Sequence, residues 1–299
     1  MTEAPLVSVV IPCVNGLPSI AECLEALARQ ADAAPAQVLV VDRCGEDTRA
    51  ALRHRFPDVE VVAAEARTTI PALRAMGVAR ARGRMVAFLE DHCNADPSWL
   101  HMIERAHREG RQAVGGAVVN GSVERVVDWA AFLCEYARFA PPLPRGAAPE
   151  ITGNNSAYDR ALLERLSREL GGEVWESFLH ARMRELGVPL FCEPDLLVSH
   201  KKRFGFAYFL SQRYHYSRSF AGMRLAGARP WKRLAYACAT ALLPALLLAR
   251  MIATLAPKRA YWRAFAIALP VILVFLTAWA LGEAIGALLG PGDSLERVE

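Results

Sequence analysis

Short apolar runs alternate with helical patterns along the first third of the chain. Four runs of mostly aliphatic residues predict buried strands, at 6–11, 38–41, 59–62 and 85–89. Between them, the spacing of apolar residues predicts helices, at 18–29, from Asp47 onward and at 70–82. This alternation predicts an α/β fold with a mostly parallel sheet covered by helices on both faces.

The pattern continues less regularly beyond residue 97. We expect helices at 98–110, at 123–139 and from Asp159, a strand at 113–119, and a Pro- and Gly-containing loop at 140–150. Two short strand-like pieces, at 189–192 and 196–199, lead to His200.

The strand at 85–89 ends in a polar cluster, residues 90–94, with sequence Glu-Asp-His-Cys-Asn. The carboxyl ends of strands are where open α/β sheets bind ligands. In extended backbone, Glu90, His92 and Asn94 would point the same way. Such a carboxylate, imidazole and amide can hold a divalent cation, more plausibly Mn²⁺ than Mg²⁺ because of the imidazole. The alternative interpretation is a solvated strand end that leads into a helix cap.

Charge is spread unevenly along the 299 residues. Residues 1–195 hold 21 basic and 27 acidic side chains, whereas residues 196–282 hold 13 basic side chains and no acid. The basic region is interleaved with long apolar runs, which favours a membrane surface over nucleic acid as its partner. Seven cysteines without paired or metal-type spacing predict reduced thiols in a cytosolic domain, and we expect no N-terminal signal peptide.

The composition predicts four regions. An α/β domain is expected in 1–203, amphipathic interfacial helices in 204–233, two hydrophobic membrane segments in 234–290, and an acidic tail in 291–299. The uncharged stretch 234–249 would span about 24 Å as a helix and 264–282 about 28 Å, against a hydrocarbon core of about 30 Å.

The loop between these two segments contains Lys258, Arg259 and Arg263. A simple hairpin would place this basic loop outside, against the positive-inside rule. We therefore expect the first segment to lie in the interface or re-enter, and the second to cross with the tail outside. The hairpin is the alternative.

Several motifs, taken in order, resemble family 2 glycosyltransferases of the GT-A fold over roughly residues 6–203. They are 7–12 (Val-Ser-Val-Val-Ile-Pro), 40–42 (Val-Val-Asp) with Asp47, 74–77 (Arg-Ala-Met-Gly) and 88–92 (Phe-Leu-Glu-Asp-His). The resemblance implies a nucleotide-sugar donor bound by Pro12, Asp42, Asp47, Arg74 and Asp91. It also implies a divalent cation, Mn²⁺ or Mg²⁺, held by Glu90, His92, Asn94 and His200.

The departures from the family pattern leave the nucleotide open. Arg43 replaces the second Asp of the Val-Asp-Asp-Gly-Ser motif, Ala75 replaces an Asn, and Glu90-Asp91-His92 replaces Asp-x-Asp. For Asp42, the alternative is an ordinary turn at a strand end.

Residues 151–157 resemble the acceptor-side segment of the family, which implies that Gly153, Asn154 and Asn155 bind the acceptor. A capped turn is the alternative there. The resemblance also aligns Glu176 with the general base of an inverting transfer, with Glu173 as its rival and a surface acid as the alternative.

Lys201, Lys202 and Arg203 would stabilise the departing diphosphate or bind lipid head groups, and the sequence does not separate the two roles. The processive members' Gln-x-x-Arg-Trp motif is absent, because 212–216 reads Gln-Arg-Tyr-His-Tyr. With only two apolar segments to follow, we expect transfer of a single sugar.

The resulting hypothesis is an inverting glycosyltransferase that acts on a lipid or lipid-linked acceptor, with its catalytic domain on the cytoplasmic side of the membrane. The alternative is a catalytically weak GT-A-like scaffold or binding protein, favoured by the altered motifs. A transport component is disfavoured by the large α/β domain.

Overall fold

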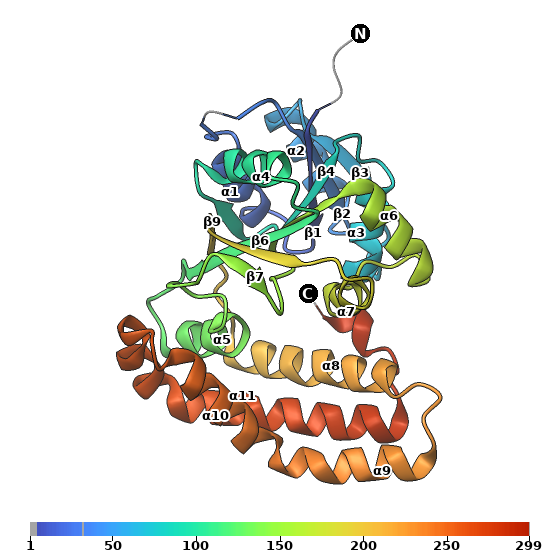
Figure 1. Ribbon diagram of the computed structural model, residues 1–299, viewed down its shortest axis with the longest axis vertical. Coiled ribbons are helices and arrows are strands. Elements are labelled where there is room, and N and C mark those ends of the chain that lie inside the picture. The colour runs from blue at the N-terminus through green and yellow to red at the C-terminus, as the bar shows by residue number, and fades with distance from the viewer. Residues whose placement is uncertain (1–4, 32, 299) are drawn as a thin grey trace. The chain divides into compact units, whose positions relative to one another are not determined.

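The computed structural model describes residues 5–31 and 33–298 (Figure 1). The chain forms two compact units. The first comprises the chain up to Val119 together with Phe139–Lys201, and the second comprises Asn120–Arg138 together with the chain from Lys202 onward. The segment 120–138, expected within the α/β domain, thus belongs to the C-terminal helical unit.

One mixed sheet forms the centre of the first unit, with strand order β3-β2-β1-β4-β8-β6-β9-β5 and with β7 paired to β9. Its strands are β1 Val7–Cys13, β2 Gln37–Asp42, β3 Glu60–Ala63, β4 Met85–Leu89, β5 Cys93–Ala95, β6 Ala113–Asn120, β7 Gly146–Ala148, β8 Asn155–Asp159 and β9 Leu190–His200. Strands β3, β2, β1 and β4 run parallel, as their apolar sequences predict.

Helices cover both faces of this sheet. They are α1 Ser19–Leu27, α2 Glu46–Arg55, α3 Ile70–Val78, α4 Trp99–Arg108, α6 Arg160–Glu169 and α7 Glu176–Glu185. On one face, α3, α6 and α7 bury Leu73, Leu163 and Met183 in one cluster with β-strand side chains. Helices α1 and α4 bury their own apolar side chains outside that cluster.

The antiparallel part of the sheet differs from the sequence-based prediction. Strand β8, within a segment interpreted as a loop before a helix, inserts between β4 and β6 and runs antiparallel to both. Its sequence, Asn-Ser-Ala-Tyr-Asp, lacks the aliphatic run of a buried strand. It is nevertheless buried, because it pairs with strands on both sides and because the Asn155 and Tyr158 side chains form hydrogen bonds inside the protein.

The second unit is helical. Its helices are α5 Val126–Tyr136, α8 Phe206–Arg224, α9 Pro230–Ala239, η1 Thr240–Leu242, α10 Leu243–Leu255, η2 Arg259–Tyr261, α11 Trp262–Leu289 and η3 Ser294–Arg297. Two stretches, Pro230–Leu255 and Arg259–Leu289, are long and apolar enough to cross a membrane. The length and composition of these two stretches suggest membrane association.

Candidate active site

The polar cluster at 90–94 is extended only from Cys93 onward, where β5 begins. Residues 91 and 92 form a turn, closed by a hydrogen bond of 2.9 Å from the Cys93 amide to the Glu90 carbonyl. The prediction that Glu90, His92 and Asn94 point the same way because of strand alternation is therefore wrong. The turn nevertheless brings Glu90 and His92 together.

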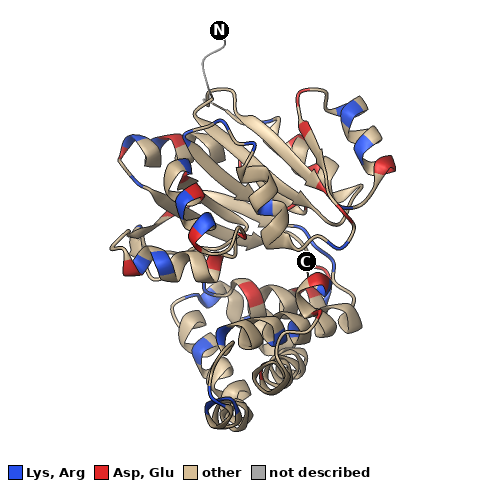
Figure 2. Cartoon of the chain, turned by 90° about the vertical axis from the view of Figure 1, so that its right-hand side faces the viewer, with Lys and Arg blue, Asp and Glu red and all other residues tan. Residues whose placement is uncertain are grey.

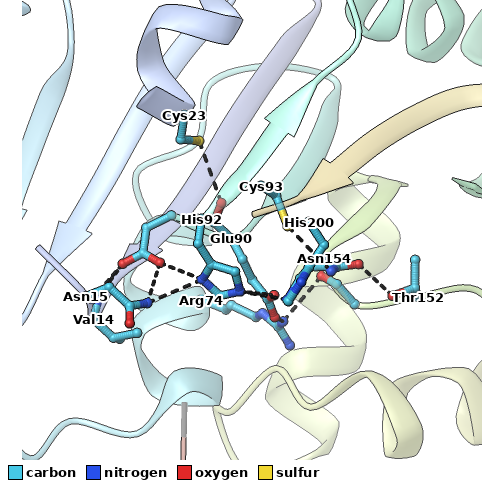
Figure 3. A network of polar contacts seen from close by, with 12 residues as sticks. Val14, Asn15, Cys23, Arg74, Glu90, His92, Cys93, Thr152, Asn154 and His200 are labelled. Carbon is cyan, nitrogen blue, oxygen red and sulfur yellow. Dashed lines mark hydrogen bonds and ion pairs between the residues drawn. The ribbon is translucent and has the colours of Figure 1, made fainter. Parts of the chain in front are cut away.

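Three side chains converge beside this turn (Figure 3). His92 Nε2 lies 3.3 Å from Glu90 Oε2 and 3.0 Å from His200 Nε2. His200 ends β9 and pairs with Cys93 of β5, so the antiparallel register brings it to the turn from the far end of the sequence. Both imidazoles are buried.

Asp91 holds the other side of the His92 ring. Its carboxylate accepts hydrogen bonds of 2.7 Å from the amides of Val14 and Asn15 and from the Asn15 side chain, and it lies 2.9 Å from His92 Nδ1. A carboxylate at Nδ1 favours hydrogen there, so that in the neutral ring the Nε2 lone pair faces Glu90 and His200. Asp91 is fully buried, so its contacts in this structure are with the protein.

Asn94 lies apart from this group. It pairs with Ser199, whereas its neighbour Cys93 pairs with His200, and adjacent strand residues point to opposite faces. The Asn94 Oδ1 atom is buried without a hydrogen-bond partner. Cys93 lies near Glu90 and His92, but burial raises the pKa of its thiol, which disfavours the thiolate form that binds metals.

The charges in the cluster depend on one another. Burial raises the pKa of Glu90, but the hydrogen bond from His92 and the positive charges of His92 and Arg74 outweigh it and lower that pKa to about 2. Burial lowers the pKa of His92, but its hydrogen bonds to Asp91 and Glu90 outweigh that effect and raise the pKa to about 8. Without a cation, therefore, the His92 imidazole is protonated on both nitrogens and positively charged at neutral pH.

Glu90 and His200 each lie at a distance from His92 Nε2 that suits neighbouring ligands of a divalent cation. Adjacent ligands of an octahedral ion with bonds of about 2.1 Å lie roughly 3.0 Å apart. The separations of 3.0 Å and 3.3 Å at His92 Nε2 match that value. One carboxylate and two imidazoles suit Mn²⁺ better than Mg²⁺.

Cation binding at this cluster should depend on pH. His92 must lose the proton that its raised pKa of about 8 retains, so the apparent affinity for Mn²⁺ should rise with pH by up to about tenfold per unit and level off above about pH 8. Calorimetric titration with Mn²⁺ at several pH values measures this. His54→Asn, which removes an exposed histidine, should leave the profile unchanged, whereas a wild-type affinity that stays flat below pH 8 would refute the linkage.

Arg74 links this cluster to Glu176. Arg74 is buried, lies 2.6 Å from Glu176 Oε2 and 3.8 Å from Glu90 Oε1, and donates a hydrogen bond of 3.2 Å to the Gly153 carbonyl. A Cβ atom at Gly153 would lie 2.8 Å from Glu176 Cδ. The glycine at this position therefore permits the close approach of Glu176.

The rival carboxylate, Glu173, lies in a different setting. Its carboxylate accepts a hydrogen bond of 3.5 Å from the hydroxyl of Thr69, and that hydroxyl also caps the start of α3. Trp175, the residue before Glu176, is buried. Glu176 thus contacts the Arg74–Glu90 cluster directly, whereas Glu173 bonds to the start of α3.

Of the residues predicted to bind the sugar acceptor, Asn155 uses both its side-chain oxygen and its side-chain nitrogen in hydrogen bonds within the protein. It donates to the carbonyls of Ala117 and Leu196, at 2.9 and 2.8 Å, and accepts a hydrogen bond of 2.7 Å from Trp99 Nε1. Asn154 is also buried, and it accepts from the Thr152 hydroxyl at 2.7 Å. In this structure Asn155 fastens β8 to its neighbours, and its acceptor role stays a prediction.

Asn155→Ala should destabilise the fold. It would leave three buried polar groups without partners, at about 1–3 kcal/mol each, so the free energy of unfolding should fall by roughly 3 kcal/mol or more. Denaturant unfolding measures this, and Asn154→Ala is the matched control with a smaller expected loss. Unchanged stability combined with weakened acceptor use would instead assign Asn155 to the acceptor.

The residues near the ends of β1 and β2 that were predicted to bind the nucleotide-sugar mainly contact other parts of the protein. Asp42 is fully buried and accepts from the amides of Cys44 and Gly45 and from Arg49, at 3.1, 3.2 and 3.1 Å. Asp47 is exposed in the first turn of α2, and Pro12 is buried in β1. The turn interpretation of Asp42 therefore describes this structure, and its donor role stays a prediction.

The three basic residues after β9 are exposed or half-buried and have different partners. Lys201 pairs with Glu22 at 3.3 Å. Lys202 lies over the rings of Phe204 and Tyr208, and Arg203 pairs with Glu124 at 2.5 Å. Their proposed roles toward a diphosphate or lipid stay predictions.

Sequence reasoning missed Asn15. We interpreted Asn15-Gly16 only as a turn, yet Asn15 contacts both Asp91 and His92. No local pattern reveals this role, because it depends on the parallel pairing of β1 with β4.

Comparison with known proteins identifies the class. The model of the family "Glycosyl transferase family 2" matches residues 8–167, more than half of the chain, and the chain belongs to that family. The predicted GT-A fold with additional C-terminal helices is confirmed by similarity to solved structures.

Two curated relatives match parts of the chain. Glycosyltransferase AglE of Haloferax volcanii is 29% identical over 120 residues, 38% of this chain and 40% of that protein. Succinoglycan biosynthesis protein ExoO of Rhizobium meliloti is 32% identical over 113 residues, 37% of this chain and 32% of that protein. The match thus spans less than half the length of either relative.

Two solved structures illustrate the likeness in fold. The mannosyltransferase PcManGT from Pyrobaculum calidifontis, in complex with GDP-Man and Mn²⁺, has a TM-score of 0.56 and 23% identity, covering 94% of this chain and 88% of that one. GalNAc-T7 with UDP, GalNAc and Mn²⁺ has a TM-score of 0.51 and 18% identity, covering 68% of this chain and 45% of that one.

Proposed function

We propose that this protein transfers a single sugar, with inversion, from a nucleotide-sugar to a lipid or lipid-linked acceptor at the cytoplasmic face of a membrane. The observation that carries the proposal is the convergence of Glu90, His92 and His200 beside the Arg74–Glu176 pair. A cation site and a carboxylate base are the two elements that such a transfer requires.

Glu90, His92 and His200 would hold the cation, with Asp91 and Asn15 orienting His92. A bound Mn²⁺ or Mg²⁺ supplies positive charge to the diphosphate of the donor. The complexes of PcManGT with GDP-Man and Mn²⁺ and of GalNAc-T7 with UDP, GalNAc and Mn²⁺ support this combination of ligands. Asn94 is left out of this set because of its pairing with Ser199.

Glu176 would act as the base. Its Oε2 is bonded to Arg74, which holds the carboxylate in place and leaves Oε1 to accept the proton of an acceptor hydroxyl. The hydroxyl oxygen then bonds to the anomeric carbon as the bond from that carbon to the diphosphate breaks. The nucleoside diphosphate leaves from the opposite side, so the configuration inverts.

The choice of acceptor rests on the C-terminal unit. Its exposed apolar helices would keep the enzyme at a lipid surface, where a lipid or lipid-linked acceptor is concentrated. The replacement of the processive motif at 212–216 supports a single transfer.

A donor screen tests the proposal and identifies the nucleotide. Thermal unfolding of the purified protein is followed with UDP-, GDP- and other nucleotide-sugars, each with and without Mn²⁺. A donor at 100 times its dissociation constant stabilises the fold by about 2.7 kcal/mol, and the stabilisation should require Mn²⁺. No stabilisation by any nucleotide-sugar would contradict donor binding.

A further inference from the structure

Helices α8 and α11 run side by side in the same direction (Figure 1). The Phe206 ring lies 5.4 Å from that of Phe275, and a Cβ atom on Gly282 would lie 2.3 Å from the Tyr214 carbonyl oxygen. The same offset of about 68 residues recurs further along, where a Cβ atom on Gly286 would lie 2.3 Å from the Arg218 carbonyl oxygen. The C-terminal half of α11 is thus covered by α8 over roughly 24 Å.

Helix α8 is not suited to hydrocarbon. Its Arg213 is buried, with the guanidinium 4.0 Å from the centre of the Trp279 ring of α11, and its Nε has no hydrogen-bond partner. Arg218 donates to the carbonyl of Gly290 at 3.3 Å. If this half of α11 entered the membrane, Arg213 and Arg218 would therefore enter it at the same depth.

The tail after α11 folds back onto α8. Gln212 donates to the carbonyl of Arg297 at 2.9 Å, and His215 lies 3.0 Å from the hydroxyl of Ser294. Asp293 and Arg297 form an ion pair of 2.6 Å within the tail. If α11 crossed the bilayer, α8 and this charged tail would lie in the hydrocarbon beside it, at a cost of several kcal/mol.

The N-terminal half of α11 also has polar neighbours. Lys258, before it, is buried and donates to the carbonyls of Ala137 and Arg138 after α5, at 2.9 and 3.2 Å. At the other end of α5, Arg125 and Asp128 form an ion pair of 2.5 Å. Both halves of α11 are therefore flanked by segments that carry charge.

The remaining surface of these helices is apolar. Twelve of the eighteen exposed large apolar side chains in the described part of the chain lie between Trp231 and Leu289, and α9 has no buried residue. Figure 2 shows the long uncharged stretches of the C-terminal helices. Soluble proteins rarely expose so much apolar surface without a partner.

Basic side chains lie next to this surface at both ends of the α9–α10 stretch. Arg229 precedes α9 and Arg259 follows α10, and both are exposed. Arg263, together with Trp129 and Ile267, lines an open crevice of about 430 Å³. Residues 196–289 contain a single acid, Glu283, which is buried and accepts hydrogen bonds from Trp279 and Tyr236.

We propose that α9, α10 and α11 lie in the plane of the membrane, within one leaflet, and do not cross it. Their apolar side would contact the acyl chains of an anionic leaflet, and Arg229, Arg259 and Arg263 its head groups. This arrangement replaces the crossing second segment expected from the sequence. It also keeps the basic loop and the tail on the same side as the α/β unit, in accord with the positive-inside rule.

Protease accessibility in membrane vesicles tests the topology. A protease recognition sequence is inserted after Ala256 in the loop, after Glu299, or between the exposed Gly171 and Gly172 of the α/β unit as the reference site. Cleavage of each variant is compared in right-side-out and inside-out vesicles. The in-plane arrangement predicts that the loop and tail sites are cleaved only in the vesicle type in which the reference site is cleaved.

The other topologies give different results. A hairpin exposes the loop site on the side opposite the reference, and a single crossing by α11 exposes the tail site there. A loop site cleaved only in detergent would place that loop inside the bilayer, and each of these results overturns the proposal. If the insertion after Ala256 unfolds the protein, Ala256→Cys in a Cys44→Ser, Cys238→Ser background is labelled with an impermeant maleimide instead.

A second experiment tests the contact with anionic head groups. Purified protein is diluted from detergent onto vesicles of phosphatidylcholine with or without phosphatidylglycerol, and the bound fraction is measured by flotation. Arg229→Gln and Arg259→Gln should each weaken partitioning onto the anionic vesicles by about fivefold, with no effect on neutral vesicles. Arg165→Gln in α6 is the control, and an effect at only one of the two sites contradicts contact along the whole stretch.

Discussion

Glu176→Gln should reduce turnover by about 10²- to 10⁴-fold while the donor still binds. The amide keeps the shape of the side chain and can still accept the hydrogen bond from Arg74, but it cannot take the proton of an acceptor hydroxyl. Steady-state transfer assays give the turnover, and thermal shift with donor and Mn²⁺ gives the binding.

Glu173→Gln is the matched control, because Glu173 lies three residues away and bonds to Thr69. It should keep nearly full activity. If the loss appears only in Glu173→Gln, the base is Glu173, and the assignment of Glu176 is wrong.

His92→Ala should weaken Mn²⁺ binding by about 100-fold or more and abolish the stabilisation that Mn²⁺ and a donor produce together. The variant removes the nitrogen that faces both Glu90 and His200, and disturbing even the groups that orient a metal ligand commonly costs 10- to 100-fold in affinity. Calorimetry with Mn²⁺ and thermal shift with donor measure the two effects.

Two control variants test whether the effect is specific to His92. His54→Ala removes an exposed histidine and should change neither quantity. Asn94→Ala should also keep Mn²⁺ affinity, because its pairing with Ser199 directs it away from His200. Turnover by His92→Ala with the same Mn²⁺ dependence as wild type would remove the cation site from this cluster.

The parallel half of the sheet could be predicted from the sequence because its strands are short, aliphatic and buried. Strand β8 could not, since Asn155 is buried through side-chain hydrogen bonds and Ser156 through its sheet pairing with Phe88 and Gly115, and neither leaves a hydrophobic period. The helix α5 was predicted, but its membership of the C-terminal unit was not, because unit boundaries depend on tertiary contacts.

The sequence predicts which residues form the candidate site better than it predicts how they are arranged. The meeting of Glu90 with His92 was expected from strand alternation, yet a turn produces it. His200 lies 108 residues from His92, and only the pairing of β5 with β9 brings the two together. For Asn155 the sequence predicts a role in binding the acceptor, whereas in the structure its side chain forms hydrogen bonds within the protein. The sequence alone does not distinguish these two roles of an amide.

The most direct test of a cation-dependent glycosyltransferase is the release of nucleoside diphosphate from nucleotide-sugars by the purified, lipid-reconstituted protein. We predict release with Mn²⁺, loss of release on chelation, recovery on adding Mn²⁺ back, and no release by Glu176→Gln beyond a small residual rate. A protein that binds a nucleotide-sugar with Mn²⁺ but releases no diphosphate, with membrane lipids present as acceptors, would contradict the account and favour a GT-A-like scaffold.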